Sequence, residues 1–494
     1  MFKQISLLFA LITCSILHAQ NHVDALRFSL FSNYNTAGIS ALGGAGGLLS
    51  ANYNPASLAF FAGNQLLSLS LGNTNKSVES IYLEETNITK TPFDIAPFIQ
   101  NVGYVSTLPF ATENDWNRFN MSFSFNRKYD FNHEMTISGY NNSNSMVDFF
   151  TNNAQGLTPD QLFESAEENF DSYYYPGDFA YQTWLINAED GDNTNYYSNT
   201  YSEAQRQRMK ISESGYIHEF DIAFSGAYKD FLFLGGSIGF TEIKFTQYKS
   251  YTEDEFDQPD STPSSAVESF EYNRILDVEG GGVNFKFGSF IKPTSFLRLG
   301  WAYHSKTYTE LDLYYDLLME TNLLDGERWE RSISSLGLPN FSSYELNSPA
   351  KSITTLSLIG DYDKLRVLFT LDYEAIDYGS SNLNSAYYSF TQENEDIAEF
   401  YARTNNKKVG LSLTMQNISL RAGYSIFGSP FKDDLNDGER EYISAGLGLS
   451  KGEYSFSIGM IKSTKNEDII LYNHQIANTE SNQNTIIATC NYRF

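Results

Sequence analysis

The chain is poor in cysteine, in positive charge and in long apolar runs. Only two of its 494 residues are cysteine, and Asp and Glu outnumber Lys and Arg by 60 to 33. The resulting net charge of −27 argues against nucleic acid or an anionic lipid surface as a partner. Beyond the N-terminus, no segment offers about 18 consecutive apolar residues, so we expect no transmembrane helix in the mature chain.

The first 19 residues have the composition of a secretory signal peptide. Lys3 supplies the basic start, and the apolar run at 5–17 is too short to span a membrane. We place the cut after Ala19. The alternative, lipid attachment at Cys14, is disfavoured because the threonine before that cysteine fits poorly and the apolar run would be cut short. Cleavage after Ala19 leaves Cys490 alone, which allows an oxidising compartment but no internal disulfide.

Aromatic residues make up 15% of the chain, with 34 Tyr and 38 Phe, which excludes a wholly disordered protein. In the second half, bulky apolar residues repeatedly alternate with small, polar or charged ones. The clearest examples are 297–303, 365–373, 418–424 and 454–460. Since successive side chains of a strand point to opposite faces, these segments are predicted to be strands with one apolar face.

The lengths of the connections carry more information than the strands. We predict fourteen strands, at 65–72, 101–109, 117–128, 216–228, 231–248, 276–292, 296–308, 351–361, 364–376, 406–415, 418–428, 441–450, 453–464 and 483–494. Every second link is a tight turn, such as Lys451-Gly452. The links between these turns are long: 129–215, 249–275, 309–350, 377–405, 429–440 and 465–482.

Short turns at one rim and long loops at the other are typical of an outer-membrane barrel. The sequence therefore predicts an all-β fold, a 14-stranded antiparallel transmembrane β-barrel. The long links would be extracellular loops. The even number of strands places both ends of the barrel at the periplasmic rim.

The last strand runs to the end of the chain. Counting back by twos from Phe494 places Tyr492, Cys490 and Ala488 on one face. A terminal aromatic residue on an amphipathic last strand resembles the signal that the barrel-assembly machinery of the outer membrane reads. We therefore predict that Phe494 is an assembly signal.

Residues 20–64 come before the barrel, which takes up 65–494. They are small, apolar and rich in turns, with five residues of Gly and Ala at 43–47. The segment is too irregular to face lipid, where every backbone polar group must be paired. We interpret it as a plug inside the barrel lumen.

At Asn54-Pro55-Ala56 the sequence becomes similar to a known family. The order of a signal peptide, the segment 24–29, a Gly-rich stretch and Asn-Pro-Ala resembles the FadL/TodX family of outer-membrane transporters for hydrophobic compounds. The pattern is that of the branch typical of Bacteroidetes-like bacteria. Later blocks, individually weaker, extend the resemblance over nearly the whole mature chain: 215–221, 282–288, 297–305 and 420–431.

The resemblance implies a monomeric 14-stranded barrel with an N-terminal hatch that shapes a ligand pocket. It implies that a long-chain fatty acid or similar compound is captured outside and leaves sideways, through a gap in the wall, into the outer-membrane lipid. Asn54, Pro55 and Ala56 would belong to the hatch; the alternative is an ordinary Asn-Pro turn. Prolines flank 92–109, which makes this segment our candidate for the irregular wall.

A fatty carboxylate in an apolar pocket needs a cationic partner, because an unpaired buried charge is costly. Four cations on the expected inner face are candidates: Lys286, Arg298, Arg366 and Arg421. Alternatively, they pair with inner acids such as Asp372 and Glu374.

We expect no metal and no cofactor. The histidines at 133, 218, 304 and 474 lack metal-ligand spacing, and 43–47 lacks the rest of a nucleotide-binding loop. Acidic runs at 253–255 and 433–434 are expected to be solvated loops; the alternative is that they bind calcium.

We predict a transporter rather than an enzyme, because nothing in the sequence points to a catalytic arrangement. No nucleotide motif or energy-coupling motif is present, so we expect the transport to be passive. The alternative is a FadL-like barrel that serves as a protein-binding scaffold, such as a shuttle in type IX secretion, with 129–215 and 309–350 as its docking loops. An enzyme of the outer membrane is a weaker third possibility.

Overall fold

The computed structural model describes residues 22–494 apart from 33, 92–96, 109–114, 164–174, 203, 338–339, 387, 433–437 and 474. The predicted signal peptide therefore lies outside the described residues, as do Pro92, Pro109, His474 and Asp433-Asp434. Among the residues that are described, no helix is long and apolar enough to cross a membrane.

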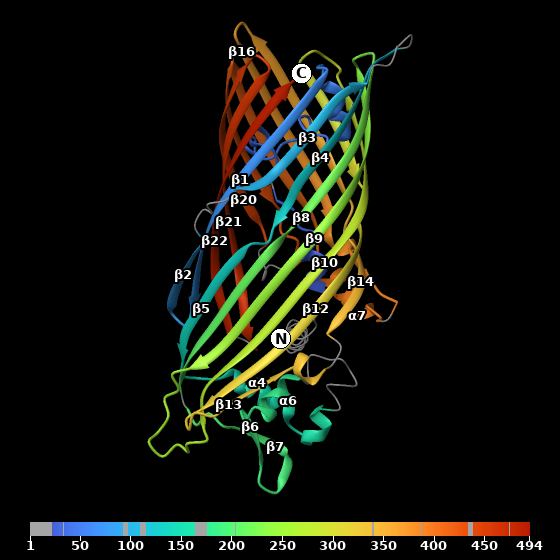
Figure 1. Cartoon of the computed structure of the whole chain (residues 1–494). Coiled ribbons are helices and arrows are strands. Elements are labelled where there is room, and N and C mark those ends of the chain that lie inside the picture. The colour runs from blue at the N-terminus through green and yellow to red at the C-terminus, as the bar shows by residue number, and fades with distance from the viewer. Residues whose placement is uncertain are drawn as a thin grey trace, which may run out of the picture.

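Within the described residues, fourteen antiparallel strands close into one barrel (Figure 1). The ring is completed where the first strand pairs with the last, with Leu66 opposite Arg493. The strands are β1 (Gln65–Tyr82), β3 (Phe98–Leu108), β4 (Trp116–Asp130), β8 (Gln205–Tyr228), β9 (Leu232–Asp254), β10 (Val267–Ile291), β11 (Leu297–His304), β15 (Lys351–Tyr362), β16 (Leu365–Asp377), β18 (Arg403–Met415), β19 (Ile418–Phe427), β20 (Arg440–Lys451), β21 (Tyr454–Tyr472) and β22 (Gln475–Arg493). The prediction of a 14-stranded barrel is confirmed.

The alternation in the sequence separates the two faces of the wall. On β10, Phe285 and Phe287 are exposed on the outside, while Lys286 between them is buried in the lumen. On β22, Ile486 is exposed and Ile487 is buried. An outer belt of apolar and aromatic side chains on a closed barrel is what a lipid bilayer requires. The chain is thus built as an outer-membrane β-barrel.

The strands reach much further toward the long-loop rim than the sequence predicted. The segment 249–275, expected to be a loop, contains the ends of β9 and β10, which stay paired as far as Phe270 opposite Glu253. The predictions that 129–215, 309–350 and 377–405 are loops along their whole length are wrong for the same reason. Further strands occupy them: β5 (His133–Asn141), β12 (Tyr308–Leu323), β13 (Arg328–Ser332), β14 (Phe341–Asn347) and β17 (Asn382–Asn384). Charged outward side chains hid the alternation there.

The wall near the first strands also differs from expectation. The described part of 92–109 contains β3, which pairs with β1 on one side and β4 on the other. One register shift, at Ser70/Leu71, interrupts the ladder with β1. β2 (Glu85–Thr91) folds back on the C-terminal part of β1, from Lys76 to Tyr82, at the long-loop end. The predicted irregular segment 92–109 is thus a paired strand at 98–108 with one bulge opposite Ser70/Leu71, while 92–96 and 109 lie outside the described residues.

A small folded unit, here called the cap, covers the long-loop end of the barrel (Figure 1). It consists of α4 (Met146–Ala154), α6 (Tyr175–Gln182), β6 (Ile186–Glu189) and β7 (Asp192–Ser198). Its core includes Phe150 and Phe179 and packs against Phe270 and Leu317 of the extended wall. The remaining short elements at this end are η2 (Ser334–Leu336), η3 (Tyr378–Ser380) and α7 (Thr391–Phe400).

The segment that precedes β1 lies inside the ring. We refer to its described residues, within 22–64, as the plug; it contains α2 (His22–Arg27), α3 (Ala37–Ser40) and η1 (Pro55–Phe60). Much of it is buried against inner side chains of the wall. The plug runs through the lumen until η1 packs near the short-turn rim, beside β8 and β9.

Candidate ligand cavity in the barrel lumen

The Asn-Pro-Ala motif fixes the C-terminal part of the plug to the wall, near the short-turn rim. Asn54 begins η1: its Oδ1 accepts a hydrogen bond from the backbone N–H of Ala56 at 3.0 Å. Its Nδ2 donates to the backbone carbonyls of Ser289 and Trp301, at 3.3 Å and 3.2 Å. Asn54 is fully buried. One asparagine thus caps the 3-10 helix and reaches two wall strands.

Inner side chains of the wall hold the backbone of the plug at several further points. The Asp372 carboxylate accepts from the N–H of Gly47 at 2.8 Å, and the Nε2 of His304 lies 2.9 Å from the carbonyl of Tyr53. The hydroxyl of Thr489 accepts from the N–H of Ala37 at 2.8 Å. These bonds satisfy backbone groups that have no regular secondary structure to pair with.

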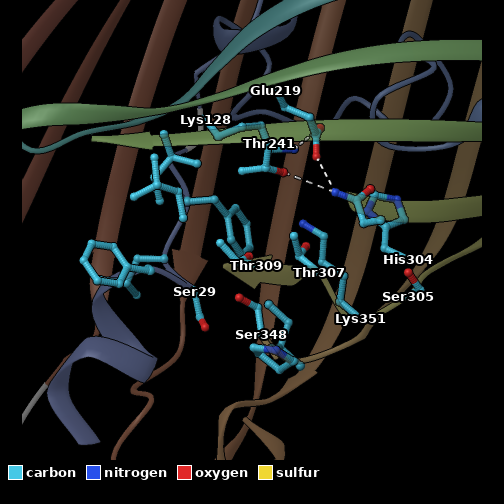
Figure 2. A pocket seen from close by; sticks show the side chains of 18 of the residues that line it. Ser29, Lys128, Glu219, Thr241, His304, Ser305, Thr307, Thr309, Ser348 and Lys351 are labelled. Carbon is cyan, nitrogen blue, oxygen red and sulfur yellow. Dashed lines mark hydrogen bonds and ion pairs between the residues drawn. The ribbon is translucent and has the colours of Figure 1, made fainter. Parts of the chain in front are cut away.

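A cavity lies between the first part of the plug and the wall. The space open to the centre of a water molecule is about 90 Å³. The plug contributes Phe28, Leu30 and Phe31 to its apolar side. Wall side chains complete the lining, with polar groups including Lys128, Glu219, Thr241, His304, Thr309, Ser348 and Lys351 (Figure 2). The cavity therefore offers an apolar surface beside a polar, cationic one.

Two acids, Glu219 in the lining and Asp221 next to it, pair with the lysines of the cavity. Lys286 is buried between Glu219 at 2.7 Å and Asp221 at 2.8 Å, and Lys128 lies 3.1 Å from the same Glu219. Lys286 is therefore fully occupied as a structural cation. This arrangement is the alternative that the sequence left open.

A second cluster lies across the cavity. Lys351 and Lys408 share Glu374, with N···O distances of 3.3 Å and 3.8 Å. The ammonium of Lys351 also lies 3.8 Å from the centroid of the Phe31 ring. Here two lysines share one carboxylate, so the charge of Lys351 is only partly compensated.

The other predicted cations are not brought to the cavity. Arg298 donates to the carbonyls of Thr294, Ser295 and Leu297 beside the short-turn rim. Arg366 is exposed and pairs with Asp361, its neighbour across the hairpin, at 2.6 Å. Arg421 is bonded to Ser457 at 3.3 Å and supports the plug at Gly38. Of the four candidates, only Lys286 lines the cavity.

Asn54, Pro55 and Ala56 are also absent from the cavity lining, because they sit nearer the short-turn rim. The residues that sequence reasoning missed are Lys128, Lys351 and the plug aromatics. The alternation along each strand could have shown that the two lysines point into the lumen. Lys128 continues the inward series of Asn126 and Ser124, and Lys351 precedes the inward Ile353 by two residues. The plug aromatics had no such periodic signal.

Known proteins match this architecture in structure. No protein-family model and no curated protein matches the chain by sequence. A FadL homologue from Pseudomonas aeruginosa is similar with a TM-score of 0.51 and 14% identity, over 94% of this chain and all (100%) of the other. The P. putida toluene transporter TodX gives a TM-score of 0.49 at 14% identity, over 94% and 99%. CymD, a monoaromatic hydrocarbon channel, gives 0.48 at 11% identity, over 94% and 99%.

At such low identity, structural similarity shows the fold, and the match to the P. aeruginosa protein spans both chains almost completely. The resemblance noted at the Asn-Pro-Ala motif is thus confirmed at the level of architecture: the chain has the plugged outer-membrane barrel fold of a FadL homologue.

Proposed function

We propose that this protein belongs to the FadL/TodX family and lets hydrophobic compounds cross the outer membrane by passive diffusion. The observation that carries the proposal is the cavity between Phe28, Leu30 and Phe31 of the plug and the inner wall. Sites for small molecules are concave and largely apolar, with a few polar groups that orient the ligand. The cavity is concave and lies in the lumen, with an apolar side formed by the plug and a polar, cationic side formed by the wall, which suits an amphiphilic ligand.

We further propose a long-chain fatty acid, or a similar amphiphile, as the ligand. The alkyl chain would lie against the plug aromatics, at about 0.8 kcal/mol for each buried methylene. The carboxylate would pair with Lys128 and Lys351, which line the cavity from opposite clusters. A ligand longer than the present cavity requires the plug to shift, and its release sideways would return it to lipid. No catalytic step is part of the proposal.

The ligand class is tested by removing the two cavity lysines. We expect Lys128→Met with Lys351→Met to lower uptake of radiolabelled oleate by roughly 10- to 100-fold, the worth of a charge-assisted hydrogen bond. Toluene uptake should change little. Glu219 and Glu374 keep Lys286 and Lys408 as partners in this variant, so the wall should stay folded. The assay uses cells that lack their own transporter for these compounds.

The matched control is Arg366→Met, which removes a cation outside the cavity. Its oleate uptake should equal that of the unmodified protein. Uptake that stays normal in the double lysine variant would contradict the carboxylate proposal. An unmodified protein that carries neither oleate nor toluene would contradict transport altogether.

A second candidate function is a protein-binding scaffold, and one feature of the long-loop end favours it. Trp184 of the cap and Trp329 of β13 are 50% and 40% exposed, with ring centroids 6.2 Å apart. Exposed tryptophans are frequent anchors in protein interfaces. Stoichiometric co-purification of a surface protein, lost in Trp184→Ser with Trp329→Ser, would support this function. Failure to co-purify any partner under gentle extraction would count against it.

A further inference from the structure

Two cations lie directly opposite each other on the inner face of the wall, beyond the apolar belt and toward the long-loop end. Lys249 of β9 is the cross-strand neighbour of Arg274 of β10. Both side chains point into the lumen, because Phe245 and Leu276, on the same faces of the two strands, belong to one core cluster with Phe28 of the plug. Like charges at opposite positions of a sheet destabilise it, so the pair lowers the stability of this part of the wall.

The pair lies away from the cavity and close to the cap. The ring of Tyr272, two residues from Arg274 on the same face, lies edge-on to Phe150 of α4, with ring centroids 5.5 Å apart. Thr241 lines the cavity and precedes Lys249 by eight residues on β9, which corresponds to about 26 Å along the strand. Both cations are only half-buried. A molecule that enters at the long-loop end would thus reach the pair before the cavity.

Within the described part of the chain, neither cation has a carboxylate oxygen within 4.0 Å. Arg274 donates to the amide oxygen of Gln247 at 3.3 Å, while its buried Nε has no hydrogen-bond partner. Lys249 forms no side-chain hydrogen bond with any described residue. Burial, followed by the charge of Arg274, lowers the pKa of Lys249 to about 7, against an opposing effect of Glu213. The surroundings therefore supply too little negative charge for the two cations.

Two acids that face this part of the lumen are bound to other groups. Glu213 of β8 accepts from the Nε2 of Gln247 at 2.6 Å. Asp24 of the plug pairs with Arg27 and accepts from the hydroxyl of Tyr344 at 3.2 Å. Neither carboxylate can move to the cation pair without breaking these bonds.

Other lysines on the inner face of the wall do have acid partners. Those within 4.0 Å of at least one carboxylate include Lys286, Lys351, Lys408 and Lys465. The chain as a whole is acidic, with a net charge of −27. The lack of an acid at Lys249 and Arg274 therefore indicates that their counter-charge comes with a ligand.

We infer that Lys249 and Arg274 form an anion-binding site, the entry site, which binds the carboxylate of an incoming ligand before the ligand reaches the cavity. The inference rests on the proposed transport function and adds a second binding site to it. An ammonium and a guanidinium both donate charge-assisted hydrogen bonds to a carboxylate. Tyr272 and Leu317, which flank Arg274, supply apolar surface for the adjoining part of an alkyl chain.

The entry site should act at low ligand concentration, because the net charge of the protein otherwise repels a carboxylate. Lys249→Met with Arg274→Met should raise the oleate concentration for half-maximal uptake by about tenfold, as expected for loss of a charge-assisted hydrogen bond. The maximal rate should stay the same, and so should the uptake of toluene, which is uncharged.

Two single variants serve as controls for the uptake measurement. Lys249→Arg keeps the charge and should behave like the unmodified protein. Lys244→Met removes a cation from the outer face of the same strand and should do so as well. An unchanged half-maximal concentration in the double variant would overturn the inference. Absence of uptake by the unmodified protein would instead reject the transport function itself.

Counting bound ligands separates the entry site from the cavity. Purified protein in a non-ionic detergent is dialysed against radiolabelled octanoate, with protein-free detergent as the blank. We expect two bound octanoates in the unmodified protein, one in Lys249→Met with Arg274→Met, and one in Lys128→Met with Lys351→Met. A single octanoate that is lost only in the latter variant would overturn the entry site and leave the cavity intact. No bound octanoate in any protein would reject the carboxylate ligand of the proposed function.

The stability of the barrel tests whether the two cations are structural. Since like charges at opposite positions repel, Lys249→Met with Arg274→Met should unfold at the same temperature as the unmodified protein or higher, as judged by heat-modifiable mobility on a gel. A lower unfolding temperature would assign the pair a structural role and overturn the inference. Displacement of octanoate from the entry site by equimolar inorganic phosphate would also overturn it, because the site would then hold free anions rather than the ligand.

Discussion

Single residues decide how closely the plug can approach the wall. Gly235 of β9 faces the lumen, and a Cβ atom added there would lie 2.5 Å from the carbonyl carbon of Pro55. Gly236, the next residue, would meet only the Lys286 carbonyl at 3.6 Å. The absence of a side chain at Gly235 is therefore what allows the Asn54-Pro55-Ala56 motif to dock. This requirement is invisible in the sequence, where the two glycines are equivalent.

Substitutions at Gly235 and Gly236 test this requirement, with Gly236 as the control. Gly235→Ala forces the backbone of η1 away from β9 and should lower the free energy of unfolding by about 1–3 kcal/mol, the usual cost of overpacking. Gly236→Ala should change it by less than about 0.5 kcal/mol. Thermal unfolding in detergent, followed by heat-modifiable mobility, measures both. Equal effects of the two substitutions would show that the plug does not rest on Gly235.

At the scale of elements, one buried carboxylate connects the cap to the barrel. Glu253, at the long-loop end of β9 and beyond the apolar belt, accepts from the N–H of Met146 at 2.8 Å and from the hydroxyl of Ser145, which caps α4. The Tyr251 hydroxyl and the Gln207 amide also donate to it, at 2.7 Å and 2.9 Å. All four donors are neutral. Burial raises the pKa of Glu253 above its ordinary value of 4.5, and these hydrogen bonds oppose the rise.

A raised pKa in the folded state means that the folded protein binds this proton more tightly than the unfolded one. The contribution to stability is therefore full below about pH 4.5 and is lost as the pH rises through the folded value. We expect the cap to be cleaved faster by protease as the pH rises through this range. Glu253→Gln should remove that dependence, because its amide does not titrate and its oxygen can still accept a hydrogen bond from the N–H of Met146. A slope that persists in Glu253→Gln would assign the pH response to another group.

The elements also show what alternation could and could not predict. Near the short-turn rim, side chains face lipid on one side and the lumen on the other, so the period of two is sharp and all fourteen strands were found. Beyond the bilayer the outer side carries charged residues such as Asp254 and Glu271, so the ends of β9 and β10 at 249–275 were mistaken for a loop. The inward orientation of the cavity lysines, Lys128 and Lys351, could have been predicted from the strand register. Phe28 and Phe31 were not, because a plug without regular structure has no period to read.

At the scale of the whole molecule, the last residue joins the ring without being needed for its core. Phe494 is exposed, its N–H donates to the carbonyl of Gln65 at 3.1 Å, and its ring lies edge-on to Tyr492. The backbone bond closes the short-turn rim between the two ends of the barrel. The side chain is left facing outward, as a signal read by another protein would have to be.

Phe494→Ala should therefore separate assembly from stability. We expect less protein in the outer membrane, with a free energy of unfolding of the purified barrel changed by less than about 0.5 kcal/mol. Phe296→Ala removes a similarly exposed aromatic from the same rim and serves as the control. Quantitative immunoblots of membrane fractions measure the first effect. Equal membrane levels of both variants would remove the special role of the terminal residue.

The pairing of β1 with β22 determines the order of steps in barrel formation. The strand made first can close the ring only with the strand made last, so the lumen stays accessible from one side until the whole chain has arrived. The plug precedes β1 directly and contacts β20, β21 and β22 through α3. Its final contacts can thus form only as the circle closes. In this protein, closure of the barrel and the final docking of the plug therefore take place in the same step.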